Sequence, residues 1–218
     1  TFLSKLIGMD YTLVKQKTSG KQKNLYYDES ILKRRGNIYL VGSWQCEEYF
    51  KAIRDILVKD FGIKHEPDKR NKSMLEKIEN SNSVCIHVRR GDYISDKKTS
   101  KVHGTCSLEY YHNAVKIIEK KVRNPEFFVF SDDSQWIKAN LKLRHPITYV
   151  NINNPEKGYE DLRLMSNCKH FIIANSSFSW WGAWLSNNPD KIICAPKKWF
   201  VSVDEGDIVP KSWIRVEG

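Results

Sequence analysis

The heptapeptide HVRRGDY, residues 87–93, places two arginines, a glycine and an aspartate directly after a short apolar run. Arg89 and Arg90 could grip an anion, because a guanidinium donates two parallel hydrogen bonds to phosphate oxygens and an ammonium group does not. Gly91 would let the backbone turn sharply or approach a ligand closely. Two other interpretations compete: Arg90-Gly91-Asp92 as an adhesion tripeptide, and a structural pair in which one arginine bridges to Asp92.

Polar clusters also follow three later apolar runs of the sequence. Ser131-Asp132-Asp133 follows FFVF, residues 151–154 follow ITYV, and Asn175-Ser176-Ser177 follows HFIIA. In open α/β sheets, ligands bind beyond the carboxyl ends of the strands, so these clusters are expected to form one site with the arginines. A surface adhesion loop needs no such neighbours, and we therefore discard the adhesion interpretation.

Each cluster has a structural alternative beside its functional one. Ser131-Asp132-Asp133 could cap the next helix, hydrogen-bond sugar or nucleotide hydroxyls, or bind a divalent cation, although two adjacent carboxylates are a weak metal signal. Asn175-Ser176-Ser177 opens a helix, where free amides and the positive dipole end favour an anion, or where a serine is a plain N-cap. Asp161 lies near the start of another helix and could simply complement its dipole.

The elements that must position these clusters become regular from residue 80 onward. Short apolar runs alternate with amphipathic helical segments, and one apolar stripe recurs at steps of three and four: Leu108, Tyr111, Val115, Ile118 and Val122, with Ser107 as the expected cap. Runs without in–out alternation are typical of a parallel sheet that is covered on both faces. Five such runs predict a doubly wound, Rossmann-like α/β domain over residues 80–218.

Residues 1–79 differ from this pattern. Residues 1–37 are polar and basic and indicate irregular or helical edge material, followed by a short strand at 38–41 and an apolar-faced helix. The polar segment around Pro67 indicates a connection to the next unit.

Composition indicates a globular protein and restricts its partners. Apolar residues make up 40% and aromatic residues 12% of the 218 residues, and the formal net charge is +10. This charge favours an acidic partner, which could be nucleic acid, an anionic membrane or a phosphorylated small molecule. The five cysteines are odd in number and form no C-x-x-C pair, so we expect free thiols of a reducing compartment.

Several common classes lack their sequence signal. There is no Walker-type phosphate loop and no G-x-G-x-x-G, the signals of ordinary nucleoside-triphosphate and dinucleotide binding. No histidine pair has zinc-binding spacing, so no metal site is assigned. No apolar stretch approaches the ~20 residues that span a bilayer.

The segments HVRRGDY, FFVFSDD and DLRLMSNCKHFIIANSSFSWWGAWL, in this order and spacing, closely resemble the signatures of the α-1,2-fucosyltransferases of glycosyltransferase family 11. YLVGSWQCEEYF resembles the segment that precedes the family's donor domain, and the likeness extends over residues 37–200. It implies an inverting GT-B-type enzyme that transfers L-fucose from GDP-β-L-fucose to the 2-hydroxyl of a galactose-type acceptor without a metal. Residues 80–218 would bind the GDP-sugar, and residues 1–79 would be the remainder of an acceptor-side domain and linker.

The resemblance also implies a role for each candidate residue. His87 and Asp161 would contact the guanine nucleoside, Arg89 with Ser176 and Ser177 would hold the diphosphate, Arg90 and Asp92 would support the loop, and Asp132 or Asp133 would shape the site. Asn175 and Phe178, which flank the two serines, complete the nucleotide-binding set, and Arg89 and Asp92 form the catalytic pair. Without a metal, such donors must stabilise the charge that develops on GDP, and one donor is typically worth ~3 kcal/mol.

The resemblance leaves several alternatives open. The motifs describe the donor better than the acceptor, so a fucosyltransferase of another linkage is the second interpretation, and a non-catalytic nucleotide-sugar or carbohydrate-binding protein is the third. The basic charge permits nucleic-acid binding, but no groove-reading helix or stacking motif supports it. The expected partners are GDP-fucose and a galactose-containing glycan, with peripheral membrane contact compatible with the charge.

The cellular compartment expected for the protein depends on its source organism. The expected location is the cytoplasm or the inner-membrane surface in a bacterium, or the Golgi lumen in a eukaryote. The glycine-rich segment with which family members begin has no counterpart here. We therefore expect this chain to bind GDP but to transfer little to an acceptor by itself, because the acceptor must also be positioned.

Overall fold

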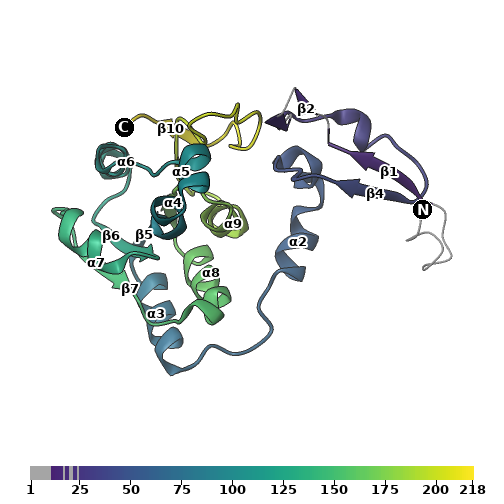
Figure 1. The fold of residues 1–218 in the computed structure, drawn as a ribbon. Helices are drawn as coiled ribbons and strands as arrows, with labels where there is room; N and C mark the ends of the chain where they lie inside the picture. Colours follow the sequence, from purple (N-terminus) through teal and green to yellow (C-terminus); the bar gives the residue numbers. More distant parts are fainter. Residues whose placement is uncertain (1–10, 17, 20–21, 24) are drawn as a thin grey trace. The chain divides into compact units, whose positions relative to one another are not determined.

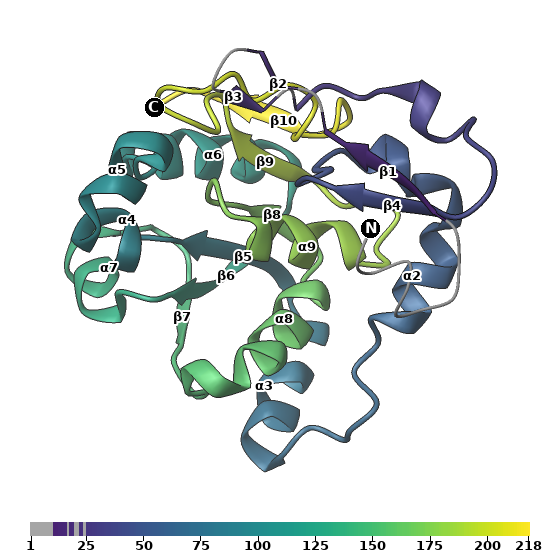
Figure 2. The same cartoon turned by 45° about the vertical axis from the view of Figure 1, so that its right-hand side comes forward.

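The structure is a computed structural model that describes residues 11–16, 18–19, 22–23 and 25–218. The chain forms two compact units: residues 1–57 with 203–210, and residues 58–202 with 211–218 (Figures 1 and 2). Within the described residues, no helix is both long enough and apolar enough to cross a membrane. All five cysteines are free thiols, as predicted.

The larger unit is built on a six-stranded, entirely parallel sheet with the strand order β10-β9-β8-β5-β6-β7. Its strands are β5 (Asn82–Val88), β6 (Pro125–Ser131), β7 (Ile147–Val150), β8 (His170–Ile172), β9 (Ile193–Pro196) and β10 (Ile214–Val216). The five predicted strands and their parallel arrangement are confirmed. The sequence did not predict β10, because three residues with a central arginine carry no apolar run and become a strand only by pairing with β9.

Helices cover both faces of this sheet. They are α3 (Lys69–Glu79), α4 (Gly91–Ser95), α5 (Lys97–His103), α6 (Leu108–Lys121), α7 (Ser134–Asn140), α8 (Gly158–Ser166) and α9 (Ser177–Leu185). Val84, Ile86 and Val88 of β5 belong to the core that α6 and α7 cover. Because successive strand side chains point to opposite faces, Cys85 and His87 lie on the other face, where α8 packs against both α3 and α9.

The predicted cap and apolar stripe of α6 are confirmed. Ser107 Oγ accepts a hydrogen bond from the Tyr110 amide at 3.0 Å, which satisfies one of the free N–H groups of the first turn. Tyr111, Val115 and Ile118 are buried in the core. The helix is therefore held by the periodic apolar face that the sequence shows.

The smaller unit contains a parallel pair of strands, β1 (Thr12–Lys15) and β4 (Ile38–Val41), and a short antiparallel pair, β2 (Thr18–Ser19) and β3 (Gln22–Lys23). The 3-10 turns η1 (Glu29–Ile31), η2 (Glu47–Tyr49) and η3 (Lys51–Ile53) follow, with α2 (Arg54–Asp60) at its boundary. The strand at 38–41 is confirmed. The expectation of irregular or helical structure before it is wrong for β1, because that strand depends on pairing with residues 26 positions away (Thr12 with Ile38).

Residues 58–79 are compact with the sheet, and α3 packs against β5 and α8. The assignment of residues 1–79 to an acceptor-side domain and linker, and of residues 80–218 to the GDP-sugar domain, stays a prediction.

Candidate functional site

Arg89 stands just beyond the carboxyl end of β5 and is held by two carboxylates. Its guanidinium forms ion pairs with Asp92 at 2.9 Å and with Asp132 at 3.3 Å, and the Tyr93 ring lies 5.7 Å from its Cζ atom. The side chain nevertheless keeps 36% of its surface exposed. A guanidinium has five N–H donors, so this arrangement fixes its direction and leaves donors for an anion.

Arg90 points elsewhere. Its guanidinium carbon lies 3.5 Å from the centre of the Trp136 ring, and its Nε is 3.3 Å from Asp133 Oδ2. Only 17% of the side chain is exposed. These contacts attach the loop to α7, and the supporting role expected for Arg90 stays a prediction.

Asp132, at the end of β6, ties two neighbouring strand ends together. Its carboxylate accepts hydrogen bonds from the backbone amides of Arg90 at 2.9 Å and Gly91 at 3.0 Å, and so caps α4. A Cβ atom on Gly91 would lie 2.8 Å from Asp132 Oδ2, closer than such atoms approach. The missing side chain of Gly91 therefore makes room for the Asp132 carboxylate. The sequence had suggested a sharp turn or the close approach of a ligand.

Asp133 has the structural role that the sequence allowed. Its Oδ1 accepts from the Trp136 amide at 3.1 Å as the N-cap of α7, and its own amide donates to Ser131 Oγ at 3.0 Å. Among the residues described, no three His, Cys, Asp or Glu side chains gather as a metal site would need.

His87 lies in β5, two residues before Arg89 and Arg90, which we call the arginine loop, and its imidazole is neutral. It is 5% exposed, and its Nδ1 is buried with no hydrogen-bond partner in the described part of the chain. Burial, assisted by the charge of Arg89, lowers the pKa of His87 to about 3. Its ring lies 5.8 Å from that of Phe178, so the end of β5 adjoins the first turn of α9.

The start of α9 offers donors beside this loop. Ser176 is the N-cap residue, yet its hydroxyl makes no capping hydrogen bond, so the plain N-cap interpretation is wrong for its side chain. Ser177 is exposed. The Tyr93 hydroxyl donates to the Asn175 carbonyl at 3.0 Å, which brings α4 to this helix start. Arg89 and the free amides of the first turn of α9 therefore belong to one region.

The side chain of Asn175 is turned away from that region, contrary to its expected ligand contact. Its Nδ2 donates to the carbonyls of His103 at 2.8 Å and Trp199 at 3.1 Å, and its Oδ1 accepts from Cys106 Sγ at 3.6 Å. Both amide N–H groups are therefore already used. Asn175 positions the loop before α6 and the segment after β9, while its backbone carbonyl positions Tyr93.

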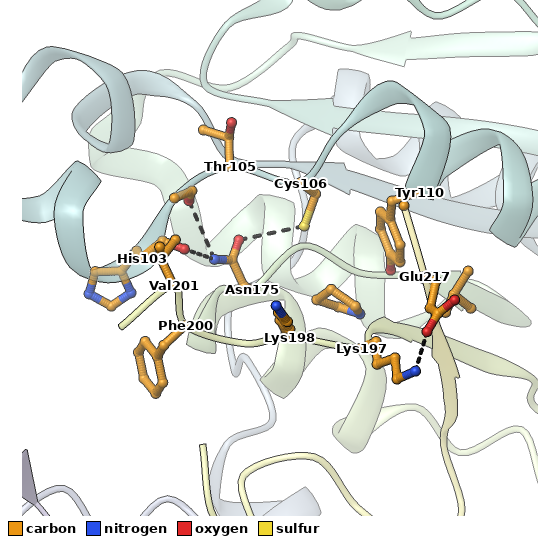
Figure 3. A pocket seen from close by; sticks show the side chains of 14 residues that line it. His103, Thr105, Cys106, Tyr110, Asn175, Lys197, Lys198, Phe200, Val201 and Glu217 are labelled. Carbon is orange, nitrogen blue, oxygen red and sulfur yellow. Dashed lines mark hydrogen bonds and ion pairs between the residues drawn. The ribbon is translucent and has the colours of Figure 1, made fainter. Parts of the chain in front are cut away.

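Behind Asn175 lies a pocket with a volume of about 420 Å³ that the sequence reasoning missed (Figure 3). Lys198 and Phe200 line it, and the His103 ring stacks on Tyr93 at 4.9 Å, which connects this wall to the arginine loop. The signal was present, since KKWF directly follows the strand ICAP and so lies at the same edge of the sheet.

Asp161 lies on α8, at a second place that we call the Asp161 corner. It lies half-buried in α8 and accepts a hydrogen bond from Asn153 Nδ2 at 2.8 Å. Burial raises the pKa of Asp161, the Asn153 bond opposes this rise, and the nearby Glu160 carboxylate adds to it. Among the described residues, no hydrogen bond or ion pair joins Asp161 to Arg89 or Arg90, so the candidate residues form two groups.

An open parallel sheet with helices on both faces is the architecture of Rossmann-like domains, which bind ligands at the carboxyl edge of the sheet. The chain belongs to glycosyltransferase family 11, whose model matches residues 14–217. This confirms the family that the sequence motifs indicated.

Curated relatives support the same family. The chain is 38% identical to an alpha-1,2-colitosyltransferase of Escherichia coli over 192 residues, which are 84% of this chain and 64% of that protein. It is 44% identical to the O-antigen biosynthesis glycosyltransferase WbnK of Escherichia coli over 140 residues, 63% of this chain and 46% of that protein. It is 27% identical to the galactoside 2-alpha-L-fucosyltransferase SEC1 of Bos taurus over 107 residues, 49% of this chain and 29% of that protein. The chain thus spans about half to two thirds of the length of the bacterial relatives.

Proposed function

We propose that the chain is the donor-binding part of an enzyme that transfers L-fucose from GDP-β-L-fucose to the 2-hydroxyl of a galactose-type residue with inversion. The observation that carries this proposal is Arg89, which two carboxylates hold beyond β5 beside the start of α9. A nucleotide-sugar glycosyltransferase must stabilise a diphosphate leaving group, and this edge offers a cation and free amides for that purpose.

In the proposed reaction, the bond between fucose C1 and the β-phosphate oxygen breaks while the acceptor oxygen bonds to C1 from the opposite face. The electron pair of the broken bond stays on GDP, and the acceptor hydroxyl releases its proton to a base. Arg89 and the first-turn amides of α9 stabilise the growing phosphate charge, and Asp92 orients the guanidinium through its ion pair. No step of this scheme uses a metal.

The nucleoside would lie on the α8 side of the site. An ionised Asp161 carboxylate can accept hydrogen bonds from guanine N1–H and the 2-amino group, which uracil cannot provide in this way. His87, held neutral by burial, adds a contact without adding charge. The specificity for guanine therefore rests on Asp161 in this proposal.

A second donor is favoured by a specific relative. The E. coli colitosyltransferase that is similar over 84% of this chain is named for colitose, which is L-fucose without its 3-hydroxyl. The transferred sugar could therefore be colitose, with the same linkage and the same nucleotide.

The deciding experiment incubates the complete protein with GDP-fucose or GDP-colitose and a panel of galactosides, and determines the product linkage by NMR. An α-1,2-fucosylated product is the expected result, and an α-1,2-colitosylated product would select the second donor. Another linkage would confine the proposal to donor binding. Tight GDP-sugar binding without any transfer would indicate a non-catalytic binding protein.

A further inference from the structure

A chain of hydrogen-bonded amides leads from the start of α3 to Asp161. Asn71 and Asn153, which are 82 residues apart, exchange two side-chain hydrogen bonds of 2.9 Å each. The second N–H of the Asn153 amide donates to Asp161 Oδ1 at 2.8 Å. One carboxylate oxygen of Asp161 is thus linked to a helix start elsewhere in the fold.

The orientation of these amides follows from their partners. Asn71 is fully buried, and Asp68 Oδ1 accepts from both its backbone amide at 3.0 Å and its Nδ2 at 3.1 Å. Rotating the Asn71 amide would therefore face its oxygen toward a carboxylate. With Asn71 fixed, a rotated Asn153 would lose the reciprocal pair and turn its own oxygen toward Asp161. A single orientation of the Asn71 and Asn153 amides therefore satisfies every donor in this series of hydrogen bonds.

We propose that Asn153, held by Asn71, is the positioning residue for recognition of the nucleotide base. It fixes the plane of the Asp161 carboxylate and leaves Oδ2, together with the second lone pair of Oδ1, for paired N–H donors of a base. This inference rests on the proposed function, in which Asp161 reads guanine. It assigns base specificity to a residue of the loop after β7 that need not touch the ligand.

Asn153 also supports the ionised form that base recognition requires. The titratable groups around Asp161 are Glu160 on its own helix, which pairs with Arg163 at 2.9 Å, and Cys85 on β5, while the Asp68–Lys157 pair lies at the far end of the amide chain. Burial and Glu160 raise the pKa of Asp161, and the Asn153 bond lowers it. Removing this bond raises the pKa further, so GDP binding should be lost at a higher pH as the medium is acidified.

The test compares Asn153→Ala and Asn153→Asp with the unaltered full-length protein by titration calorimetry of GDP and UDP between acidic and neutral pH. Asn140→Ala is the control, because it removes an exposed side-chain amide at the end of α7, before β7 and outside the clusters that form the proposed site. Both Asn153 variants should lose about tenfold in GDP affinity, as expected for one hydrogen bond to a charged group. Their UDP affinity should stay unchanged, and the midpoint of GDP binding should move to higher pH. Asn140→Ala should alter none of these.

The outcomes separate the two proposals. Equal binding of GDP and UDP by the unaltered protein would overturn the guanine assignment itself. In a second outcome, the unaltered protein prefers GDP, and both Asn153 variants keep the full preference and the same pH midpoint. That result would overturn the role of Asn153 alone. UDP binding, which the diphosphate contacts support, shows on the same samples that each variant is folded. A parallel loss of GDP and UDP affinity would mean that Asn153 is merely structural, and would also reject the inference.

Discussion

The arginine loop after β5 and the Asp161 corner of α8 hold their functional side chains by different means. At the arginine loop, partly exposed charges pair with one another, as Arg89 does with Asp92 and Asp132. At the Asp161 corner, a half-buried carboxylate is held by neutral amides. Exposed ion pairs contribute little to stability, whereas a buried charge needs hydrogen bonds to remain ionised.

This difference shows where each region is vulnerable. The arginine loop owes its shape to backbone hydrogen bonds with Asp132 and to the stacking of Arg90 on Trp136. Because the ion pairs of Arg89 are not needed to hold that shape, its guanidinium is available to bind a ligand. The Asp161 corner depends on an unbroken series of side-chain hydrogen bonds. Changes in the loop should therefore affect diphosphate affinity, and changes at the corner should affect the choice of base.

Replacing Arg89 should have the largest effect. Arg89→Ala removes the exposed cation and should nearly abolish binding and use of GDP-fucose, while Arg89→Lys should reduce it by about tenfold or more because an ammonium does not reproduce the guanidinium fork. Steady-state kinetics and calorimetry measure the loss. The circular dichroism spectrum should stay unchanged, since the side chain is partly exposed. Arg144→Ala, an exposed arginine before β7 at the opposite edge of the sheet, is the control. Normal kinetics in a folded Arg89→Ala protein would exclude this residue from the site.

The Asp161 corner is tested by the preference for guanine. GDP should compete with the donor well and UDP poorly, and Asp161→Ala should reduce that difference by about tenfold or more, because it removes a charged acceptor of two hydrogen bonds. Competition assays with both nucleotides give the ratio. Glu156→Ala, which removes an exposed acid from the turn before α8, should leave the ratio unchanged. A variant at Asp161 that keeps the full ratio would contradict the assignment.

Gly91→Ala should have a smaller effect, confined to the loop. The added Cβ would meet Asp132 Oδ2 at 2.8 Å and displace the carboxylate that caps α4. Loss of such a cap costs about 1 kcal/mol, so the KM for the donor should rise by about fivefold while GDP remains preferred over UDP. Gly158→Ala is a matched control, since Gly158 also begins a helix and an added Cβ there meets no atom within 4 Å. Equal kinetics of the two variants would show that the Asp132 contact does not position Arg89.

Chelation should have the smallest effect. If protein cations replace a metal at the diphosphate, transfer by the complete enzyme should survive excess EDTA, and Mg²⁺ or Mn²⁺ should change the rate little. Initial rates with and without chelator measure this. Loss of activity that Mn²⁺ specifically restores would instead assign Asp132 and Asp133 to a cation.

Local sequence pattern was a sound guide to the secondary-structure elements. The run of apolar residues in β5, the periodic face of α6 and the Ser107 cap depend on neighbours in the chain, and all are confirmed. The rule that ligands bind at the carboxyl edge of a parallel sheet then brought Arg89, Asp132 and Ser176 to the same edge. The same rule, applied to KKWF, would also have located the pocket behind Asn175.

Direction of side chains, by contrast, was decided by tertiary structure. Arg89 and Arg90 are adjacent and chemically identical, yet one stays open beside Asp92 and the other stacks on Trp136. The Asn175 amide turns to His103, and Asn71 meets Asn153 across 82 residues. By itself the sequence determined the repeating elements and the polar residues at their ends, because backbone periodicity is local. Which polar atoms remain free for a ligand depends on partners far apart in the chain, because every buried donor and acceptor must first be satisfied within the fold.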